Sequence, residues 1–376
     1  MTVLAGARVV SPAGVLDGVE VRIADGRIAA VGEAGPATAS GERVELAGCW
    51  LVPGFVDLHM HGGGGHDVTR SVDDLRAAVR FHRGHGTTRT LVSLMAQPVD
   101  QLCEQLGWIA ELTAAGEILG AHLEGPFLSS VRCGAQRPEN LLAPDPLVLG
   151  KLLEAGQGAV RTMTVAPELP GAAGLIADLL AAGVIAAVGH TDASYEQAAE
   201  AFAAGATLAT HLFNAMGSSL DHRAPGPSVA ALDAGVFVEM INDGVHVHDA
   251  LTRLVARVAP EKLIFITDAI SAAGSGDGEY PLADQTVRVS DGNAWSVADR
   301  LAGSTLTLDE AVRRAVLEVG LGIEQAVAAA SSTPARLLGL ADECGAIRVG
   351  LAADLVVLDA ELRVRRVMVG GSWLDA

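Results

Sequence analysis

The chain is poor in cysteine, in aromatic residues and in positive charge. Its 376 residues include four cysteines that lie far apart without a CxxC pair, so neither a disulfide framework nor a thiolate zinc site is expected. Lys and Arg total 26 against 45 Asp and Glu, a formal net charge of -19. This balance argues against binding to nucleic acid or to an anionic membrane surface, because no basic surface would neutralise phosphates. A small anionic substrate stays compatible if single arginines are placed locally.

No membrane-spanning segment is expected either. The apolar stretch 175–188 is interrupted by Asp178 and Gly183, and it is too short to cross a bilayer. The first ten residues lack the basic start of a signal peptide. Half of the residues are hydrophobic, which is enough for a sizeable core. We therefore expect a folded cytoplasmic protein.

Both ends of the chain are predicted to form strands. Residues 2–10 and 19–23 are followed by Asp25-Gly26, a hairpin signal, and then by the apolar run 27–31. The last part of the chain is similar, with runs rich in Val and Leu at 346–349, 354–359 and 363–369. We expect one small β-sandwich domain made of residues 1–50 and 336–376.

The middle of the chain, residues 51–335, predicts an α/β fold of the (β/α)8 TIM-barrel type. Eight apolar runs alternate with helical stretches rich in Ala and Leu, as in a parallel sheet covered on both faces. A doubly wound open sheet is disfavoured because no GxGxxG follows the first run. The runs are 51–59, 87–94, 118–124, 160–167, 185–190, 208–212, 237–241 and 263–267.

Histidines gather where these runs end. Barrel enzymes build their active sites at the carboxyl ends of the strands, and six of the 11 histidines fall there, with two carboxylates. Any one of them alone would more often be a structural residue. Together at one rim, they need partners or a metal to offset the cost of burying polar groups. The residues are His59, His61, His122, Glu124, His190, His211, His246 and Asp268.

Imidazole and carboxylate ligands without thiolate suit Zn²⁺, and Fe²⁺, Mn²⁺ or Co²⁺ are compatible. His59 and His61 are two residues apart, so on a strand they point to the same face. A metal of this class lowers the pKa of bound water and polarises a carbonyl. Asp268 could accept the proton of that water and pass it to the leaving group. The pattern therefore predicts metal-dependent hydrolysis.

Longer motifs around these residues resemble the amidohydrolase superfamily and, within it, the N-acetylglucosamine-6-phosphate deacetylases. The resemblance implies hydrolysis of the acetamide of N-acetylglucosamine 6-phosphate to glucosamine 6-phosphate and acetate. HLEGPF, HLFNAM and AGSTLTL together are typical of the deacetylases. The matching segments are PGFVDLHMHG (53–62), HLEGPF (122–127), VGHTDA (188–193), THLFNAM (210–216), APGP (224–227), INDGVHV (241–247), FITDAISAAG (265–274), LAGSTLTL (301–308) and GAIRVGLAADLVVLD (345–359).

The resemblance also implies roles for the residues at the rim. Asp268 matches the general acid/base. Glu124, His190 and His211 match the ligands of the principal metal. His59 and His61 match a pair that helps to hold a second metal in some members, so one or two ions per subunit are expected, with Glu124 as the favoured bridge.

Further residues match the family's substrate contacts. His246, Asn214 and Ala215 resemble contacts to the sugar and the carbonyl. Arg223 resembles a phosphate-binding arginine that reaches in from a neighbouring subunit, which implies a homodimer. Gln136 stands in the substrate loop where many members carry a histidine.

Lysine usage narrows the subclass. The only lysines are Lys151 and Lys262, and neither ends the fourth run, which disfavours members that bridge two metals with a carboxylated lysine.

Two other functions stay open. One is the same hydrolysis of another N-acetylated sugar phosphate, such as the galactosamine epimer. The other is a non-catalytic barrel used as a scaffold, which the complete set of ligands disfavours.

Two shorter patterns predict local structure. The residues TLDE at 307–310 are typical of a capping box that opens an amphipathic helix. The glycines at 62–65 are interpreted as a bend beside the metal site rather than as a phosphate-binding loop.

Overall fold

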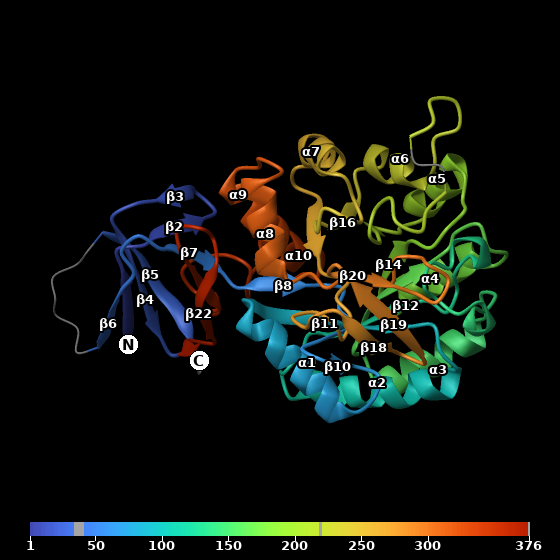
Figure 1. Ribbon diagram of the computed structural model, residues 1–376, viewed down its shortest axis with the longest axis horizontal. Coiled ribbons are helices and arrows are strands. Elements are labelled where there is room, and N and C mark those ends of the chain that lie inside the picture. The colour runs from blue at the N-terminus through green and yellow to red at the C-terminus, as the bar shows by residue number, and fades with distance from the viewer. Residues whose placement is uncertain (34–40, 218–219, 375–376) are drawn as a thin grey trace. The chain divides into compact units, whose positions relative to one another are not determined.

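The computed structural model describes residues 1–33, 41–217 and 220–374 (Figure 1). The chain divides into two compact units. One contains Met1–Asp57, Arg80–Arg89 and Thr307–Ala376, and the other contains Leu58–Val79 and Thr90–Leu306. The domain boundaries expected from the sequence, after residues 50 and 335, stay a prediction.

Eight parallel strands form the sheet that carries the site. They are hydrogen-bonded in chain order, and each corresponds to one of the predicted runs, so the predicted α/β barrel is confirmed. The strands are β8 (Phe55–Asp57), β11 (Thr87–Met95), β12 (Gly120–Glu124), β13 (Val160–Val165), β14 (Ile185–Val188), β15 (Leu208–Ala209), β16 (Phe237–Ile241) and β17 (Leu263–Ile266).

The barrel closes where the chain that follows β8 meets the chain that follows β17. The Asp268 N–H donates to the His59 carbonyl at 2.8 Å, and the His61 N–H donates to the Ala269 carbonyl at 2.8 Å. Met60 and Ala269 form a parallel bridge between these two bonds. Closure therefore places the two histidines of the HxH pair directly beside Asp268.

Helices cover the outside of this sheet in the unit that contains the site (Figure 1). Their starts follow sequence signals: Asp145 caps α3 ahead of Pro146, and Ser194 with Gln197 forms a capping box on α5. The helices are α2 (Val99–Ala114), α3 (Pro146–Gly156), α4 (Ala172–Ala181), α5 (Tyr195–Ala203), α6 (Pro227–Asp233) and α7 (Asp249–Val258). The short pieces β9 (Gly62–Gly63) and β10 (His66–Asp67) precede α1 (Val72–Gly84).

A three-stranded antiparallel sheet, not predicted from the sequence, follows β17. It contains β18 (Gly278–Leu282), β19 (Gln285–Ser290) and β20 (Asn293–Trp295). Its apolar side chains share a small core with Met95 and Ile270. The sheet therefore adds an apolar wall beside the barrel mouth.

The two ends of the chain share a mixed six-stranded sheet, as predicted. Its order is β23-β22-β21-β7-β2-β3, and a second sheet has the order β5-β4-β1-β6. Apolar residues of both sheets, such as Leu4, Val21 and Leu355, form one core. The strands are β1 (Thr2–Ala5), β2 (Arg8–Ser11), β3 (Gly14–Leu16), β4 (Val19–Ala24), β5 (Arg27–Glu33), β6 (Glu42–Glu45), β7 (Trp50–Pro53), β21 (Leu355–Leu358), β22 (Val364–Val369) and β23 (Ser372–Trp373).

Two predicted runs are each divided by a glycine. Residues 2–10 form β1 and β2 in different sheets, because Gly6 adopts a φ of +80° and turns the chain. The run 51–59 is divided at Gly54, so β7 joins the sheet of the chain ends and β8 joins the barrel. A side chain at position 54 would collide with the Thr88 hydroxyl, which explains the glycine.

Two other local predictions are wrong. Residues 346–349, expected to be a strand, form turns and irregular backbone instead. Thr307 does precede α8 (Leu308–Leu317), but its side chain makes no capping hydrogen bond, so there is no capping box. Helices α9 (Ile323–Ala330) and α10 (Ser332–Leu337) follow.

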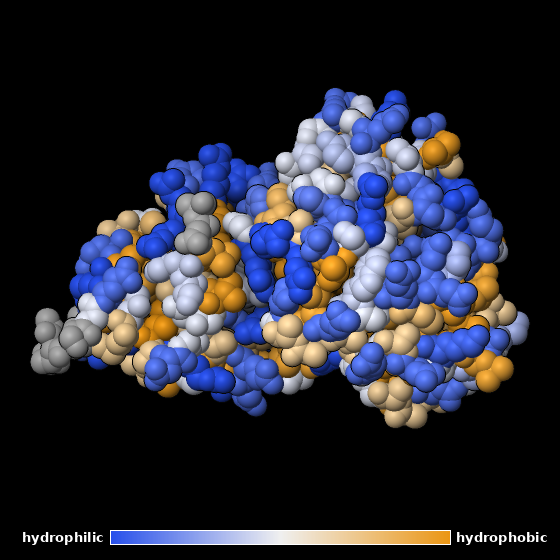
Figure 2. Space-filling view, turned by 90° about the horizontal axis from the view of Figure 1, so that it is seen from below, coloured by the Kyte–Doolittle hydropathy of each residue, from blue (hydrophilic) through white to orange (hydrophobic). Residues whose placement is uncertain are grey.

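Within the described residues, no helix combines the length and the apolar character needed to cross a membrane. The face shown in Figure 2 is largely hydrophilic, with hydrophobic residues in scattered groups. Scattered apolar groups of this kind are ordinary for a protein surface in water.

Candidate metal centre

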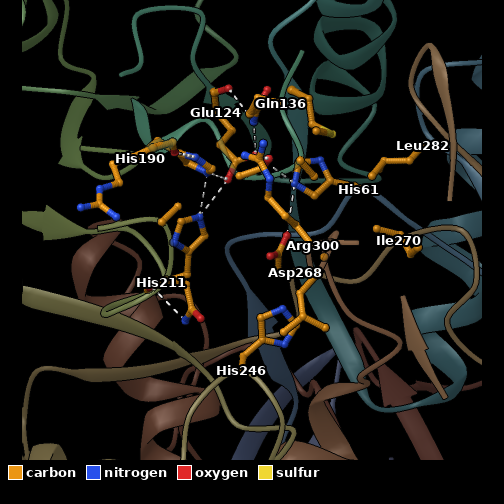
Figure 3. A pocket seen from close by; sticks show the side chains of 18 of the residues that line it. His61, Glu124, Gln136, His190, His211, His246, Asp268, Ile270, Leu282 and Arg300 are labelled. Carbon is orange, nitrogen blue, oxygen red and sulfur yellow. Dashed lines mark hydrogen bonds and ion pairs between the residues drawn. The ribbon is translucent and has the colours of Figure 1, made fainter. Parts of the chain in front are cut away.

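Glu124 is the last residue of β12, and His190 and His211 follow the ends of β14 and β15. The three side chains converge (Figure 3). The Glu124 Oε1 lies 3.0 Å from Nε2 of His190 and 3.0 Å from Nε2 of His211. The two histidine nitrogens are 3.1 Å apart, and all three residues are buried. The three ligand atoms are therefore close enough to bind one metal ion together.

A second group consists of His59, His61 and Asp268. The Nε2 atoms of the two histidines are 3.0 Å apart, and each lies 3.4 Å from Asp268 Oδ1. Glu124 also faces this group, with Oε1 at 3.4 Å from His59 Nε2 and Oε2 at 3.5 Å from His61 Nε2. One carboxylate therefore lies between the two groups.

The hydrogen bonds of the outer ring nitrogens show that these groups fit a cation. The His61 Nδ1 faces the Ser93 carbonyl at 3.1 Å, and the His190 Nδ1 faces the Arg132 carbonyl at 2.9 Å. A carbonyl only accepts, so in each ring Nδ1 carries a proton, and the neutral form of such a ring presents the lone pair of Nε2 inward. Lone pairs and carboxylate oxygens then face one another, an arrangement that a divalent metal ion satisfies.

The charges of these groups depend strongly on one another. Burial raises the pKa of Asp268, but His59 and His61 outweigh it and hold that pKa below its ordinary value. Burial likewise raises the pKa of Glu124, and His190 and His59 lower it well below the usual range. Both carboxylates are therefore ionised at neutral pH, as metal ligands or a general base must be.

Three of these residues have unusual backbone geometry. His190, His211 and Asp268 have φ values of +45°, +27° and +48°, in or near the left-handed region that residues other than glycine seldom adopt. Such positions persist where the surroundings fix them. The carbonyl of Asp268, for example, accepts the Ser304 N–H at 2.8 Å.

A pocket of about 300 Å³ opens onto both groups. It brings together the predicted site residues with three exceptions. His59 and His122 are buried behind the lining, where the His122 ring contacts the Thr164 hydroxyl, and Arg223 lies on an exposed loop where its N–H donates to Asp221. Apolar side chains of Ile270 and Leu282 form one wall. The predicted residues that line the pocket are His61, Glu124, Gln136, His190, His211, Asn214, Ala215, His246 and Asp268.

His246 lies at the edge of the pocket opposite Glu124 (Figure 3). Its Nδ1 is 2.6 Å from Asp243 Oδ2, and this carboxylate accepts the ring proton. Burial lowers the pKa of His246, but the hydrogen bond to Asp243 outweighs it and raises the pKa above its ordinary value. The protonated ring can therefore donate from Nε2 into the pocket.

Two residues predicted to contact the substrate, Gln136 and Asn214, form hydrogen bonds within the protein through their side chains. The Gln136 Nε2 donates to Glu124 Oε2 at 2.6 Å, and its Oε1 accepts the Ala96 N–H at 2.8 Å. The Asn214 side chain donates to the carbonyl of His211 at 3.3 Å. Gln136 thus steadies a candidate ligand, and Asn214 steadies the turn that follows another.

Two residues near the site, Arg300 and Glu239, were not predicted as site residues. Arg300 reaches the pocket from the loop after β20, with Nη1 at 3.3 Å from the Gly134 carbonyl, and no pattern in the sequence marks it. Glu239 is fully buried on β16. It is the single carboxylate in the otherwise apolar run 237–241, which was a usable signal.

The glycine-rich bend at 62–65 lies close to other backbone, as interpreted from the sequence. A Cβ at Gly62 would lie 2.5 Å from the His66 carbonyl oxygen and 2.6 Å from the Ser271 nitrogen. No side chain fits there without moving the backbone, so the glycine allows the tight bend directly after the HxH pair.

Comparison with known proteins decides the family. A model of the amidohydrolase family matches residues 50–374. The chain belongs to this family. Over 98% of its length it is 35% identical to the N-acetylgalactosamine-6-phosphate deacetylase of Escherichia coli O157:H7, covering 98% of that protein. It is also 36% identical to the N-acetylglucosamine-6-phosphate deacetylase of Bos taurus, over 88% of this chain and 84% of the relative.

Solved structures agree with this assignment. The chain is 43% identical, with a TM-score of 0.95, to a mutant of N-acetyl-D-glucosamine-6-phosphate deacetylase from Mycobacterium smegmatis in complex with N-acetyl-D-glucosamine-6-phosphate. The match covers 99% of this chain and 98% of that one. The membership that the motifs predicted, in the deacetylase group of the amidohydrolases, is confirmed.

Proposed function

We propose that the protein hydrolyses the acetamide of N-acetylglucosamine 6-phosphate to glucosamine 6-phosphate and acetate. The observation that carries the proposal is the pair of buried ligand groups facing one pocket, with Glu124 between them and Asp268 at its wall. The Mycobacterium smegmatis relative that was solved with this sugar phosphate supports the choice of substrate.

The metal is proposed to be Zn²⁺, because its preferred ligands are imidazole and carboxylate in these numbers; Fe²⁺, Mn²⁺ and Co²⁺ accept the same ligands. Glu124, His190 and His211 would hold one ion, and His59, His61 and Asp268 would hold a second. An ion of this class supplies water of lowered pKa and a polarised acetyl carbonyl.

The chain's own residues would move the proton and bind the carbonyl. Asp268 is ionised in the resting site, so its carboxylate accepts a proton from the attacking water and then delivers that proton to the amide nitrogen as it leaves. His246, whose pKa is raised by its bond to Asp243, donates in its protonated form from Nε2 to the carbonyl oxygen or a sugar hydroxyl. Both steps take place at side chains that are largely buried, where such interactions are stronger than in bulk water.

The sugar phosphate would be bound by the rest of the pocket. Asn214 and Ala215 line it together with Gln136, and we propose that they contact the sugar. Arg223 does not line its own chain's pocket, so we propose that it binds the phosphate of a neighbouring subunit in a homodimer. Charged sugar phosphates do not cross membranes freely, which makes the cytoplasm the fitting location.

The test is acetate release by protein stripped of metal and reloaded with Zn²⁺. Metal-dependent release from N-acetylglucosamine 6-phosphate, and much slower release from unphosphorylated N-acetylglucosamine, is the expected result. Equal release of acetate from both sugars would support the proposed hydrolysis but contradict recognition of the phosphate. No release from either sugar, with metal bound, would contradict the proposed reaction and favour a scaffold.

A second candidate substrate is N-acetylgalactosamine 6-phosphate, the galactosamine epimer. It is supported by the similarity to the Escherichia coli O157:H7 N-acetylgalactosamine-6-phosphate deacetylase, which extends over 98% of both chains. The ratio of kcat/KM for the two sugar phosphates decides between them, because that ratio measures the difference in transition-state binding.

A further inference from the structure

We propose that Glu239 is a positioning residue that orients His59 for a metal ion held with His61 and Asp268. The inference rests on the proposed two-ion centre. It gives a role to a buried carboxylate that the proposed reaction does not use.

Glu239 contacts one residue of each ligand group, His59 in one and His211 in the other. Its side chain, 2% exposed, extends from β16, and Oε2 lies 3.5 Å from His59 Nδ1. The same oxygen lies 3.4 Å from the backbone N–H of His211. The Glu239 carbonyl accepts the Leu212 N–H at 2.7 Å, so the residue is fixed to the turn that carries His211.

A buried carboxylate needs compensation, and among the described residues Glu239 finds it in these two groups. Within residues 1–33, 41–217 and 220–374, no lysine or arginine lies at ion-pair distance from it. Its partners are Nδ1 of His59 and the backbone N–H of His211, and both of these residues are candidate metal ligands. A salt bridge that merely stabilises the fold would normally include a basic side chain.

The geometry determines which nitrogen of His59 faces the pocket side. A carboxylate can only accept, so it holds the proton on Nδ1 and leaves the lone pair on Nε2. That Nε2 is the atom at 3.0 Å from His61 Nε2 and 3.4 Å from Asp268 Oδ1. Carboxylate–histidine pairs of this kind fix the ring and make it a better ligand.

The contact would strengthen when a metal ion binds. At 3.5 Å the pair is at the outer limit of a hydrogen bond. A cation on Nε2 makes the Nδ1–H more acidic, so its bond to the carboxylate becomes charge-assisted and shorter. Glu239 would thus favour the loaded site over the empty one.

The test compares Zn²⁺ binding to wild type and Glu239→Gln by competition with a chromophoric chelator. The amide keeps the size of the side chain but removes its charge. The affinity of the second ion is expected to fall about 10- to 100-fold, with the first ion changed much less. Glu168→Gln is the matched control, because Glu168 accepts from Thr191 and Asp192 and contacts no ligand ring.

The outcomes separate this inference from the proposed function. A single ion bound by wild type would overturn the two-ion centre and, with it, the role of Glu239. Two ions bound with the same affinities by wild type and Glu239→Gln would overturn the role of Glu239 alone.

A measurement on wild type decides the matter if Glu239→Gln fails to fold. In ¹H–¹⁵N spectra of the Zn²⁺-loaded protein, we expect a slowly exchanging, hydrogen-bonded proton on His59 Nδ1. A His59 ring that binds the metal through Nδ1, or whose Nδ1 proton exchanges freely, would overturn the inference.

Discussion

The Nε2 atoms of His59 and His61 lie 3.0 Å apart, while the outer nitrogen of each ring faces an acceptor: the Glu239 carboxylate for one and the Ser93 carbonyl for the other. Two lone pairs at that distance repel each other unless a proton or a metal ion lies between them. Because the residues are two apart on an extended segment, the spacing creates the contact, and barrel closure against Asp268 holds it in place.

Replacing Asp268 by Asn should abolish proton transfer with the fold intact. The amide cannot accept a proton, so kcat is expected to fall at least about 100-fold, the lower range for loss of a general base. The measurements are the initial rate of acetate release and the circular dichroism spectrum. The control is Asp284→Asn, a surface carboxylate paired with Arg137, which should keep its activity. Undiminished turnover in Asp268→Asn would contradict the mechanism.

The pH profile should depend on Asp243. Its carboxylate raises the pKa of His246, and only the protonated ring donates from Nε2 while Nδ1–H is bonded to Asp243. Activity should therefore be present below the raised pKa and be lost as pH rises through it. In Asp243→Asn the pKa of His246 falls, so the alkaline limb of kcat/KM should move to lower pH. An unmoved limb would exclude His246 as the donor.

Arg223 is expected to bind the phosphate of the substrate that lies in the site of the other subunit. Loss of a charge-assisted hydrogen bond costs about 1.5–3 kcal/mol, so Arg223→Ala should raise KM for the sugar phosphate about 10- to 100-fold. Unphosphorylated sugar should be unaffected. Mixing Arg223→Ala protein with Asp268→Asn protein should restore activity, because a mixed dimer contains one complete site. No restoration in verified mixed dimers would contradict binding in trans.

Two Arg–carboxylate pairs should differ in their effect on stability. Asp354 is buried and accepts both Arg89 Nε and the Gly370 N–H at 2.8 Å, so Asp354→Ala should lower the free energy of unfolding by about 3 kcal/mol. The pair of Arg76 with Glu117 is half-exposed, and Glu117→Gln should cost much less, because water screens an exposed ion pair. Urea denaturation measures both, and equal losses would contradict this ranking.

The barrel and most of the site could be predicted because they follow simple periodicities. Apolar runs give the strands, and parallel strands in one barrel bring their carboxyl ends together, so His59, Glu124, His190 and Asp268 could be grouped before any contact was known. The pattern could not show that the run 51–59 serves two sheets, because its apolar character continues through Gly54.

Other features depend on tertiary contacts that a local pattern does not contain. The sheet β18–β20 consists of short strands with many polar residues and gives only a weak signal. Arg300 follows that sheet in the chain and lines the pocket with Ile270, a position that depends on tertiary packing. At Thr307 the pattern predicted a feature that the structure lacks. The residues of a capping box are present, but the capping hydrogen bond does not form.

The positive φ angles of His190, His211 and Asp268 have a consequence for protein engineering. Backbone strain of this kind costs on the order of 1–3 kcal/mol per residue, and glycine would relieve it. A directed-evolution screen scored on heat resistance alone would therefore enrich glycine at the three positions that hold the ligands and the base. Libraries built on this scaffold need these codons held constant, or a screen that scores turnover together with melting temperature.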